Sequence, residues 1–165
     1  MTSADRARAL KKSPAWVLGC GSYMTHNSIL SMPDLTVTPA KQSGEIAFKM
    51  AGLSPKDIDV LELYDSFTVT VLLQLEDLGF CRKGEGGDLV SGQRTAPGGT
   101  LPVNTNGGGL SFIHPSLYGI FLLIEATRQL RGECGERQVP GARVALCNAI
   151  GGHLSCSSTV ILGRD

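Results

Sequence analysis

The sequence predicts one α/β domain in which a five-stranded mixed sheet has helices packed on it. Segments typical of strands and of helices alternate three times, and a final pair of strands completes a sheet that helices can cover. A chain of 165 residues fits a single domain, because a domain of this size removes roughly 70% of its unfolded surface from water. The 21 glycines are the compositional outlier. Most of the excess lies at 84–109 and around Gly151, where we expect tight backbone turns.

The first strand and helix follow a short polar segment. Residues 1–13 are polar and basic, and Pro14 ends any short helix that they form, because proline cannot continue a helix. The apolar run at 15–20 predicts a buried strand. A helix is expected from Pro39, since proline suits the first helical position, to Gly52, a residue type typical of the position after a helix.

A second strand and helix follow a capping box at 54–57, which holds about one helical turn. Apolar and polar residues alternate over 58–64, the pattern of a strand with one buried face. Apolar residues then recur at helical spacing until Gly79 ends the run. The apolar positions of this helix are Phe67, Val71, Leu75 and Leu78.

The third unit begins with a long glycine-rich segment. Residues 81–99 contain too few apolar side chains for a regular element, and a loop of this length inside a compact domain is usually functional. Residues 101–103 predict a short strand. Residues 119–130 predict an amphipathic helix that has Glu125 on its polar side and is closed by Gly132.

Polar residues follow the ends of three strands. The last two strands are predicted at 143–147 and 156–162. Tyr64 and Asp65 follow the second strand, the loop 104–118 follows the third, and the loop 148–155 follows the fourth. Because ligands of α/β sheets bind beyond the carboxyl ends of strands, we expect these loops to converge on one pocket.

Charge and cysteine content exclude several classes of function. The 15 basic and 15 acidic residues form no run of one sign, so neither a nucleic acid nor an anionic membrane surface is an expected partner. No segment approaches the ~18 apolar residues of a membrane span or the apolar core of a signal peptide. Five spaced cysteines without a C-x-x-C pair predict reduced thiols in a cytoplasm and no metal site. They are Cys20, Cys81, Cys134, Cys147 and Cys156.

The loop 104–118 gathers chemically assorted polar groups among three consecutive glycines. The simpler alternative is a surface loop whose glycines permit positive φ. His114 precedes a proline and stands about one turn before an apolar helix, whose first amides are free. A neutral imidazole there could act as a general base or donate a hydrogen bond to the oxyanion of a thioester carbonyl. The alternative for His114 is a histidine that caps its own loop.

Tyrosine and cysteine side chains offer further candidates. The phenols of Tyr64 and Tyr118 could donate to an oxyanion or, if deprotonated, accept a proton, although a tyrosine at a strand end is more often packed with its hydroxyl satisfied. Cys147 is the best placed cysteine for a nucleophile, but its position in an alternating strand favours a small buried residue. The other cysteines are interpreted as structural.

Four motifs, in order, resemble the C-terminal half of the thiolase superfamily. Residues 104–115 (Asn-Thr-Asn-Gly-Gly-Gly-Leu-Ser-Phe-Ile-His-Pro) resemble its N-x-x-G-G…G-H-P signature, and 62–67 (Glu-Leu-Tyr-Asp-Ser-Phe) resemble its E-[IL]-[NH]-[ED]-x-F motif. Residues 148–152 resemble its final glycine-rich loop, and 79–87 are similar to a loop of the sterol-carrier or lipid-transfer-protein type. The similarity begins at about Trp16 and covers nearly the whole chain.

The resemblance implies a five-layered α-β-α-β-α fold of two similar halves, of which residues 1–165 supply the second, with 1–13 as a linker or helix. The first half would carry the acyl-accepting cysteine and most contacts to the adenine end of coenzyme A, so the isolated chain is expected to be inactive. Coenzyme A thioesters are the implied substrates, with no covalently bound cofactor. The residues implied in substrate binding are Asp65, Asn104, Asn106, Gly107, Gly108, Gly151 and Gly152.

Two positions depart from the thiolase pattern. Tyr64 stands where many thiolases have an oxyanion-hole asparagine and sterol-carrier thiolases a histidine, and Ala149 stands where they have a second cysteine. The segments that contain Tyr64 and Tyr118 are similar instead to thiolase-like aldolases of bacterial steroid side-chain degradation, which split a β-hydroxyacyl-CoA into a ketone and a shorter acyl-CoA. Retro-aldol cleavage needs only removal of the hydroxyl proton and stabilisation of the enolate. We assign Tyr64 or Tyr118 to the first task, and His114 with nearby amides to the second.

Three functions therefore remain open. A thiolase-like aldolase is preferred over an acyltransferase of the lipid-transfer-protein type, and a non-catalytic module that binds acyl-CoA or assembles with a partner is the third. The resemblance also implies partners. These are the N-terminal thiolase half, a second copy in a homo-oligomer, and a small OB-fold protein that contains zinc.

Overall fold

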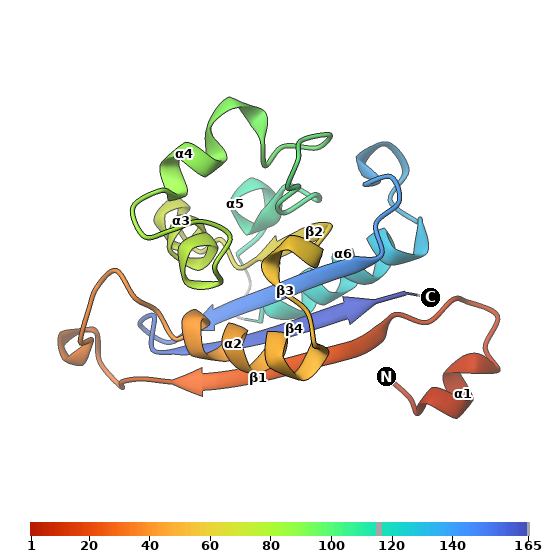
Figure 1. Cartoon of the computed structure of the whole chain (residues 1–165), viewed down its shortest axis with the longest axis horizontal. Helices are drawn as coiled ribbons and strands as arrows, with labels where there is room; N and C mark the ends of the chain where they lie inside the picture. Colours follow the sequence, from red (N-terminus) through yellow and green to blue (C-terminus); the bar gives the residue numbers. More distant parts are fainter. Residues whose placement is uncertain (115–116, 165) are drawn as a thin grey trace.

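A four-stranded mixed sheet forms the centre of the molecule (Figure 1). The computed structural model describes residues 1–114 and 117–164. The strand order is β1-β4-β3-β2, in which β1 pairs with β4 and β4 with β3 in antiparallel fashion, while β3 and β2 are parallel. The strands are β1 (Trp16–Met24), β2 (Val60–Leu63), β3 (Val144–Gly151) and β4 (Cys156–Gly163).

Within the described residues the sheet has four strands, so the prediction of five is wrong. The segment expected to be the fifth, 101–103, makes a single parallel bridge to Leu61. Leu101 instead donates its amide hydrogen to the carbonyl of Arg94 at 3.0 Å. Pro102 has no amide hydrogen to add to a ladder. The backbone amides of this segment therefore form hydrogen bonds with the preceding loop and not with the sheet.

Helices cover both faces of the sheet. On one face α2 (Ala40–Ala51) packs across β1 and β4 with α3 (Thr68–Asp77) beside it, and on the other face α6 (Gly119–Arg131) packs on β3 and β2. Helix α2 can approach β1 closely because Gly21 has no side chain. A Cβ at this position would lie only 2.2 Å from the carbonyl oxygen of Ser43. The predicted α/β class, a mixed sheet with helices packed on it, is confirmed.

The two longest helices end at the glycines that the sequence predicts. Gly52 after α2 and Gly132 after α6 have φ of 66° and 71°, in the left-handed region. Residues with a Cβ pay steric strain there, whereas glycine does not. These glycines therefore let the chain leave each helix and turn back toward the sheet.

Strand β3 continues beyond its predicted end at Cys147. Asn148 fits inside the sheet, fully buried, because its side chain has a partner for each polar atom. Its amide donates to Gln74 at 2.8 Å, and its carbonyl oxygen accepts from the hydroxyls of Ser157 and Thr159 at 2.9 and 2.7 Å. The loop predicted between the last two strands therefore shrinks to a tight turn.

Short helices occupy segments that composition alone assigns to loops. The stretch 81–99 contains two of them, so the prediction that it lacks regular elements is wrong in part. The capping box at 54–57 does hold one short turn, as predicted. The short helices are α1 (Ala4–Arg8), η1 (Ile29–Ser31), η2 (Pro55–Asp57), α4 (Gly86–Val90), η3 (Ser91–Gln93), α5 (Gly108–Phe112) and η4 (Gly135–Arg137). In the described part of the chain, no helix has the length and apolar character that a membrane crossing requires.

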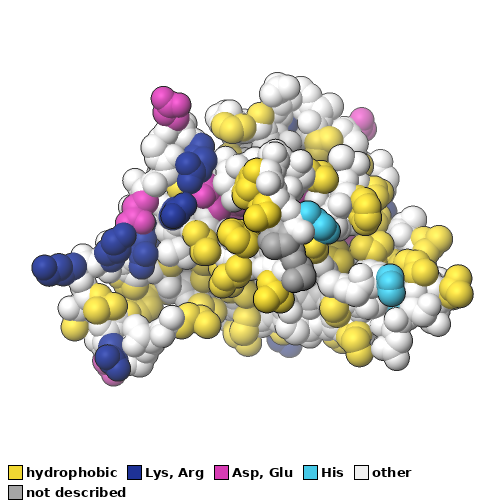
Figure 2. Space-filling view, turned by 180° about the vertical axis from the view of Figure 1, so that it is seen from behind, with side chains coloured by type: hydrophobic (Ala, Val, Ile, Leu, Met, Phe, Trp, Pro, Cys, Tyr) yellow, Lys and Arg dark blue, Asp and Glu magenta, His cyan; other side chains and the backbone are white. Residues whose placement is uncertain are grey.

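The outer face of α6 is apolar in its first two turns, and Arg128 is exposed nearer its C-terminal end. Ile120 and Ile124, one helical turn apart, are 54% and 41% exposed, while Glu125 is buried. The prediction that Glu125 lies on a polar outer side is therefore wrong. In Figure 1 α6 lies behind the sheet, and Figure 2, which views the molecule from behind, shows hydrophobic side chains gathered across the middle of that face.

Candidate active site

Three aromatic rings stack beside the carboxyl ends of the parallel strands. Tyr64 directly follows β2, and its amide donates to the carbonyl of Asn148 on β3 at 2.9 Å, which fixes the residue at that edge of the sheet. The ring of His114 lies 6.2 Å from that of Tyr64 with the planes 5° apart, and the ring of Tyr118 lies 5.5 Å away at 27°. Tyr64 thus lies between the rings of the two other residues singled out in the sequence, and Tyr118 stacks in turn on Phe121 at 5.8 Å and 20°. The rest of the His-Pro motif, Pro115 and Ser116, lies outside the described residues.

Two cavities flank Tyr64 and share it as a common wall. The first, about 540 Å³, is walled by Tyr118, Leu117, Ile120, Ala149 and Cys156 together with neighbouring backbone. The second, about 530 Å³, is walled by His114, Ser66, Thr70, Gly152 and His153 and by apolar side chains. Gly151 also lines both cavities, so the turn after β3 reaches the site as the strand-end argument predicts.

The glycine turn before α5 is held by side chains that the sequence assigns to substrate binding. Asp65 accepts hydrogen bonds from the amides of Gly109 and Leu110 at 2.8 and 3.1 Å. Gly108 has φ of 71°, and a Cβ there would lie 2.2 Å from the Asp65 carboxylate. Asn106 accepts from the amide of Gly108 at 2.9 Å. These groups shape the turn, and their direct contact with substrate stays a prediction.

Asn104 and Gly107 complete this turn. Asn104 adopts φ of 51°, a left-handed conformation that asparagine tolerates better than most residues, and its side chain accepts from the amide of Leu63 at 2.7 Å. Gly107 has φ of 96° and donates its amide hydrogen to the carbonyl of Asn104 at 2.8 Å. The side chain of Asn104 therefore ties the glycine turn to the last residue of β2, directly before Tyr64.

The hydroxyl of Tyr118 is buried under the same turn. The residue is 1% exposed, and the end of its ring lies close to Gly109. No group of the described residues meets the geometry of a full hydrogen bond to this hydroxyl, and a weak hydrogen-bond contact with the Asn106 side chain lowers its pKa only slightly against the other effects. Burial, followed by the charges of Asp65 and Glu62, raises the pKa of Tyr118 well above its usual range. At neutral pH this phenol is a hydrogen-bond donor and cannot take up a proton.

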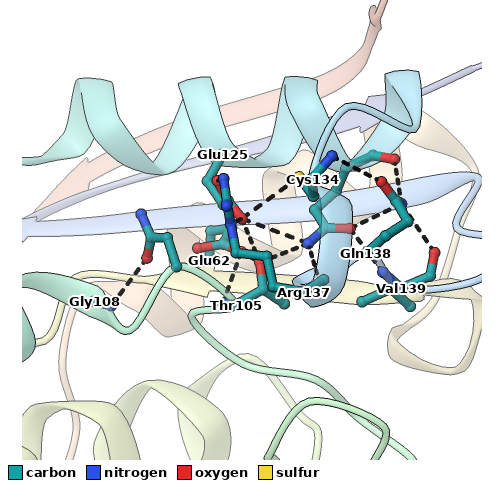
Figure 3. A network of polar contacts seen from close by, with 10 residues as sticks. Glu62, Thr105, Gly108, Glu125, Cys134, Arg137, Gln138 and Val139 are labelled. Atoms are coloured by element: carbon teal, nitrogen blue, oxygen red, sulfur yellow. Dashed lines mark hydrogen bonds and ion pairs between the residues drawn. The ribbon is translucent and has the colours of Figure 1, made fainter.

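A buried polar network lies on the α6 side of the sheet, close enough to Tyr118 to act on its phenol (Figure 3). Glu62, on β2, and Glu125, on α6, are 0% and 2% exposed. The hydroxyl of Thr105 lies 2.9 Å from a carboxyl oxygen of each. Arg137 donates to both oxygens of Glu125 at 2.8 and 3.1 Å. The motif that contains Glu62 is visible in the sequence, but only the fold shows that Thr105 and Glu125 meet it.

The pKa values of the two carboxyls in this network are shifted in opposite directions. Burial raises the pKa of Glu62 to about 8, against hydrogen bonds from Thr105 that lower it, and the negative charge of Glu125 adds to the increase. Burial also raises the pKa of Glu125, but the hydrogen bonds from Arg137 and Thr105 outweigh it and hold that pKa below its usual range. At neutral pH, Glu62 is therefore mainly a neutral acid and Glu125 a carboxylate.

The cysteines divide between core and cavity. Cys147 is 3% exposed, and burial raises the pKa of its thiol well above the usual value, so its interpretation as a small buried residue is confirmed. Cys156, interpreted as structural from the sequence, lines the first cavity. A Cβ on Gly151 would lie 2.9 Å from its sulfur. Cys156 and His153, which lines the second cavity, are the site residues that the sequence did not single out. Within residues 1–114 and 117–164, no three or more His, Cys, Asp or Glu side chains are grouped to hold a metal ion.

A mixed sheet covered on both faces, with glycine turns and stacked rings at the carboxyl edge of β2 and β3, defines a thiolase-like α/β domain. The chain belongs to the family described as thiolase C-terminal domain-like, whose model matches residues 21–164. The family resemblance read from the four sequence motifs is confirmed.

Three known proteins illustrate the range of relatives. An acetyl-CoA acetyltransferase of Methanothermobacter thermautotrophicus is 38% identical over 98% of this chain and 43% of that protein. The 17-hydroxy-3-oxo-4-pregnene-20-carboxyl-CoA lyase of Mycobacterium tuberculosis is 40% identical over 80% of this chain and 35% of that protein. A solved structure described as Ltp2-ChsH2(DUF35) aldolase has a TM-score of 0.87 and 34% identity, over 99% of this chain and 43% of that chain. The chain thus spans less than half the length of these relatives.

Proposed function

We propose that this chain is the C-terminal half of a thiolase-like acyl-CoA enzyme that cleaves a β-hydroxyacyl-CoA by retro-aldol chemistry. The observation that carries the proposal is the position of Tyr64, between the rings of His114 and Tyr118 and in the wall of both cavities. Ala149, where the resemblance implies a second thiolase cysteine, also lines the first cavity and offers no acid or base. The similarity to a CoA lyase and to an aldolase structure supports the same function.

The cleavage needs a base for the β-hydroxyl proton and donors for the enolate oxygen. We assign the base to Tyr64, because its side chain lines both cavities whereas the hydroxyl of Tyr118 is buried and unreachable. As the proton leaves, the oxygen electrons form the ketone carbonyl, the bond between the α and β carbons breaks, and its electrons become the enolate of the shorter acyl-CoA. His114 and the turn at Gly152, which line the same cavity, would donate to the enolate oxygen. Tyr64, which takes up the hydroxyl proton as a phenolate, then gives that proton to the α carbon of the enolate, so the base is regenerated and the reaction is complete.

The two cavities suit the two products. The cavity on the Tyr118 side is walled mainly by apolar and small side chains, and none of its lining residues carries a charge. We assign it to the group that leaves as the ketone. The cavity on the His114 side contains the hydroxyls of Ser66 and Thr70 and the imidazole of His153, which suit the thioester end. Tyr64 would then stand beside the bond that breaks.

Partners follow from the length of the relatives and from the outer face of α6. The chain spans 43% of the acetyltransferase and 43% of the aldolase chain. Ile120 and Ile124 remain exposed on α6, and large exposed apolar patches commonly mark protein interfaces. We propose that an N-terminal thiolase half covers them, and that the assembled enzyme is a homo-oligomer. The name of the aldolase structure joins Ltp2 to ChsH2(DUF35), which supports an additional partner protein. A small OB-fold protein that contains zinc, as the resemblance implies, is the partner we propose.

An acyltransferase is the second candidate, because the acetyltransferase relative matches 98% of the chain. Substrate and product analysis separates the two functions. The chain, assembled with an N-terminal half, is incubated with a β-hydroxyacyl-CoA alone, and with a β-ketoacyl-CoA plus free coenzyme A, and products are identified by mass spectrometry. Release of a ketone and a shorter acyl-CoA in the first reaction supports the aldolase. Thiolysis in the second reaction alone would overturn it, and calorimetric binding of acyl-CoA without turnover would identify a non-catalytic module.

We also propose that the protein works in the cytoplasm. Its five cysteines are free thiols, and thiols of this kind persist in a reducing compartment. This location is tested by labelling the protein in intact cells and measuring which cell fraction contains the label.

A further inference from the structure

The hydroxyl of Thr105 lies at the centre of the network in Figure 3, in contact with three side chains. It is 2.9 Å from Oε1 of Glu62, 2.9 Å from Oε1 of Glu125 and 2.9 Å from Nε2 of Gln129. The orientation of the Gln129 amide is fixed by two other bonds: Nε2 donates to the carbonyl of Arg137, and Oε1 accepts from the amide of Val139, both at 2.9 Å. Gln129 is therefore a donor to Thr105.

A hydroxyl carries one hydrogen and two lone pairs. Gln129 takes one lone pair of Thr105, which leaves one hydrogen and one lone pair for two carboxyl groups. If both Glu62 and Glu125 were ionised, one carboxylate oxygen would face a lone pair at 2.9 Å in a buried site. Each contact is satisfied only if one of the two carboxyls carries a proton and donates it to Thr105.

The surroundings identify Glu62 as the protonated partner. Glu125 is paired with the guanidinium of Arg137 through both of its oxygens, which favours its charged form. Glu62 contacts no cation among the described residues. Its Oε2 is buried without a hydrogen-bond partner there, a costly place for a charge. The resulting chain of bonds runs from the Glu62 acid to the Thr105 hydroxyl and from that hydroxyl to the Glu125 carboxylate.

We propose that Glu62 is a positioning residue that works as a neutral acid, binding Thr105 so that Tyr64 and the glycine turn keep their relative places. Glu62 lies two residues before Tyr64 on the same face of β2, and Thr105 lies between Asn104 and Asn106 of the turn. The acid therefore joins the strand that carries the central ring to the loop that covers Tyr118. This role concerns the protonation and packing of the network, and only its catalytic consequence rests on the proposed function.

Loss of the proton is opposed by the groups that face Glu62 from each neighbouring element. The two carboxylates among these groups are Glu125, from α6, and Asp65, which follows β2, and both disfavour a charge on Glu62. The phenol of Tyr118 and the thiols of Cys134 and Cys147 also face Glu62, but their raised pKa values keep them neutral when Glu62 titrates. Arg137, whose own pKa is raised in part by the charge of Glu62, is already bonded to Glu125. Ionisation of Glu62 would place two carboxylates on one hydroxyl and loosen the link to the turn.

The sign of the pH effect follows from linkage. The pKa of Glu62 rises from 4.5 to about 8 on folding, so the folded chain holds a proton that the unfolded chain releases between these values. Glu62 therefore lowers the free energy of unfolding progressively as pH rises through this window. Glu62→Gln keeps a donor to Thr105 without a titratable proton. We therefore expect the melting temperature of Glu62→Gln, relative to that of the wild type, to increase from pH 5 to pH 8.

Two measurements test the proposal on this chain and its Glu62→Gln variant, with the exposed Glu45→Gln as control. Infrared spectra at pH 6 should contain the carbonyl band of a buried carboxylic acid that Glu62→Gln lacks and Glu45→Gln retains. The difference in melting temperature between Glu62→Gln and the wild type should increase with pH, whereas that of Glu45→Gln should stay constant. A missing acid band, or a Glu62→Gln difference that is flat from pH 5 to 8, overturns the assignment of the proton.

The catalytic consequence is tested in the assembled enzyme. The wild type should lose turnover as pH rises past about 8, and Glu62→Gln should keep its turnover there while matching the wild type within about twofold at pH 6.5. A shared alkaline limb in both proteins overturns the positioning role even if the infrared band is present. If neither protein turns over any β-hydroxyacyl-CoA, the proposed function fails, whereas the infrared and thermal results still decide the state of Glu62.

Discussion

Tyr64 and Tyr118 belong to one ring stack, yet their hydroxyls have different surroundings. The Tyr64 side chain lines two cavities, whereas Tyr118 is 1% exposed and has a phenol whose pKa is raised by burial and by nearby carboxylates. The sequence alone left the proton-transfer role open between these two residues. Burial is the property that separates them, because a base must reach the proton that it removes.

Substitution of each tyrosine by phenylalanine tests this distinction. Tyr64→Phe should lower kcat for retro-aldol cleavage by roughly 100-fold or more, the range for loss of a general base. Tyr118→Phe removes a buried hydroxyl that has no described partner, so we expect less than about a tenfold loss. Steady-state kinetics of the assembled enzyme measure both, with circular dichroism as a control for folding. Equal losses in the two variants would contradict the assignment of the base to Tyr64.

Gly108 illustrates a residue whose identity is set by backbone geometry. It has φ of 71°, and a Cβ would lie 2.2 Å from Asp65 Oδ2. Gly108→Ala should therefore destabilise the chain by about 1–3 kcal/mol, the cost of strained backbone at a constrained position. Gly87→Ala is the matched control, because Gly87 lies in α4 with open space around its Cβ position, and it should stabilise by roughly 0.4–1 kcal/mol. Chemical denaturation measures both, and a neutral Gly108→Ala would show that the turn is not held as described.

At the scale of elements, local signals predicted helix ends well and helix faces less well. Gly52 and Gly132 close α2 and α6 as predicted, because a left-handed cap depends on the residue at one position. Glu125 was placed on the wrong side of α6, because its burial depends on Thr105 and Arg137, which come from distant parts of the chain. Asn148 extends β3 for the same reason, since its partners lie on α3 and β4.

In the candidate site, too, features set by a local motif could be predicted, whereas features that depend on distant parts of the chain could not. The rings of Tyr64, His114 and Tyr118 could be singled out because each follows or precedes a predicted element in a recognisable motif. Cys156 could not, since a thiol at the start of a strand gives no signal until the sheet shows which way it faces. In the structure its sulfur lies against Gly151 of the neighbouring strand, and Cys156 lines the first cavity.

The position of Cys156 on β4 gives a prediction about substrate size. Cys156→Met should fill part of the cavity assigned to the ketone end and lower kcat/KM about tenfold or more for a substrate with a ring-sized group on the β carbon. A substrate with small groups on that carbon should be affected far less. Cys20→Met, at an exposed position on β1, is the control. Competition kinetics with the two substrates test this, and an equal loss for both would remove the cavity from the proposal.

At the scale of the whole molecule, the sheet with its two helical layers makes a coherent domain but leaves one face with the character of an interface. Helix α6 turns Glu125 and Gln129 inward, where Arg137, Thr105 and Gln138 satisfy them, and turns Ile120 and Ile124 outward. A helix that buries Glu125 and Gln129 and exposes its isoleucines is stable alone only because the network beneath it is satisfied. The arrangement is expected when a second body covers the isoleucines.

Assembly with an N-terminal half can be tested on that face. The double substitution Ile120→Glu and Ile124→Glu places two charges where a partner would bury them, so it should weaken association by about tenfold or more, as expected for apolar residues at the centre of an interface. Because both side chains are exposed in the chain alone, the free energy of unfolding should change by less than about 0.5 kcal/mol per site. Ile46→Glu on α2 is the matched control, since Ile46 and Ile124 are both 41% exposed but lie on helices that cover opposite faces of the sheet. Sedimentation velocity with the separately expressed halves measures the association. Weakening by Ile46→Glu alone would move the interface to the α2 side, and the cavities beside Tyr64 would then stay open to water in the assembled enzyme.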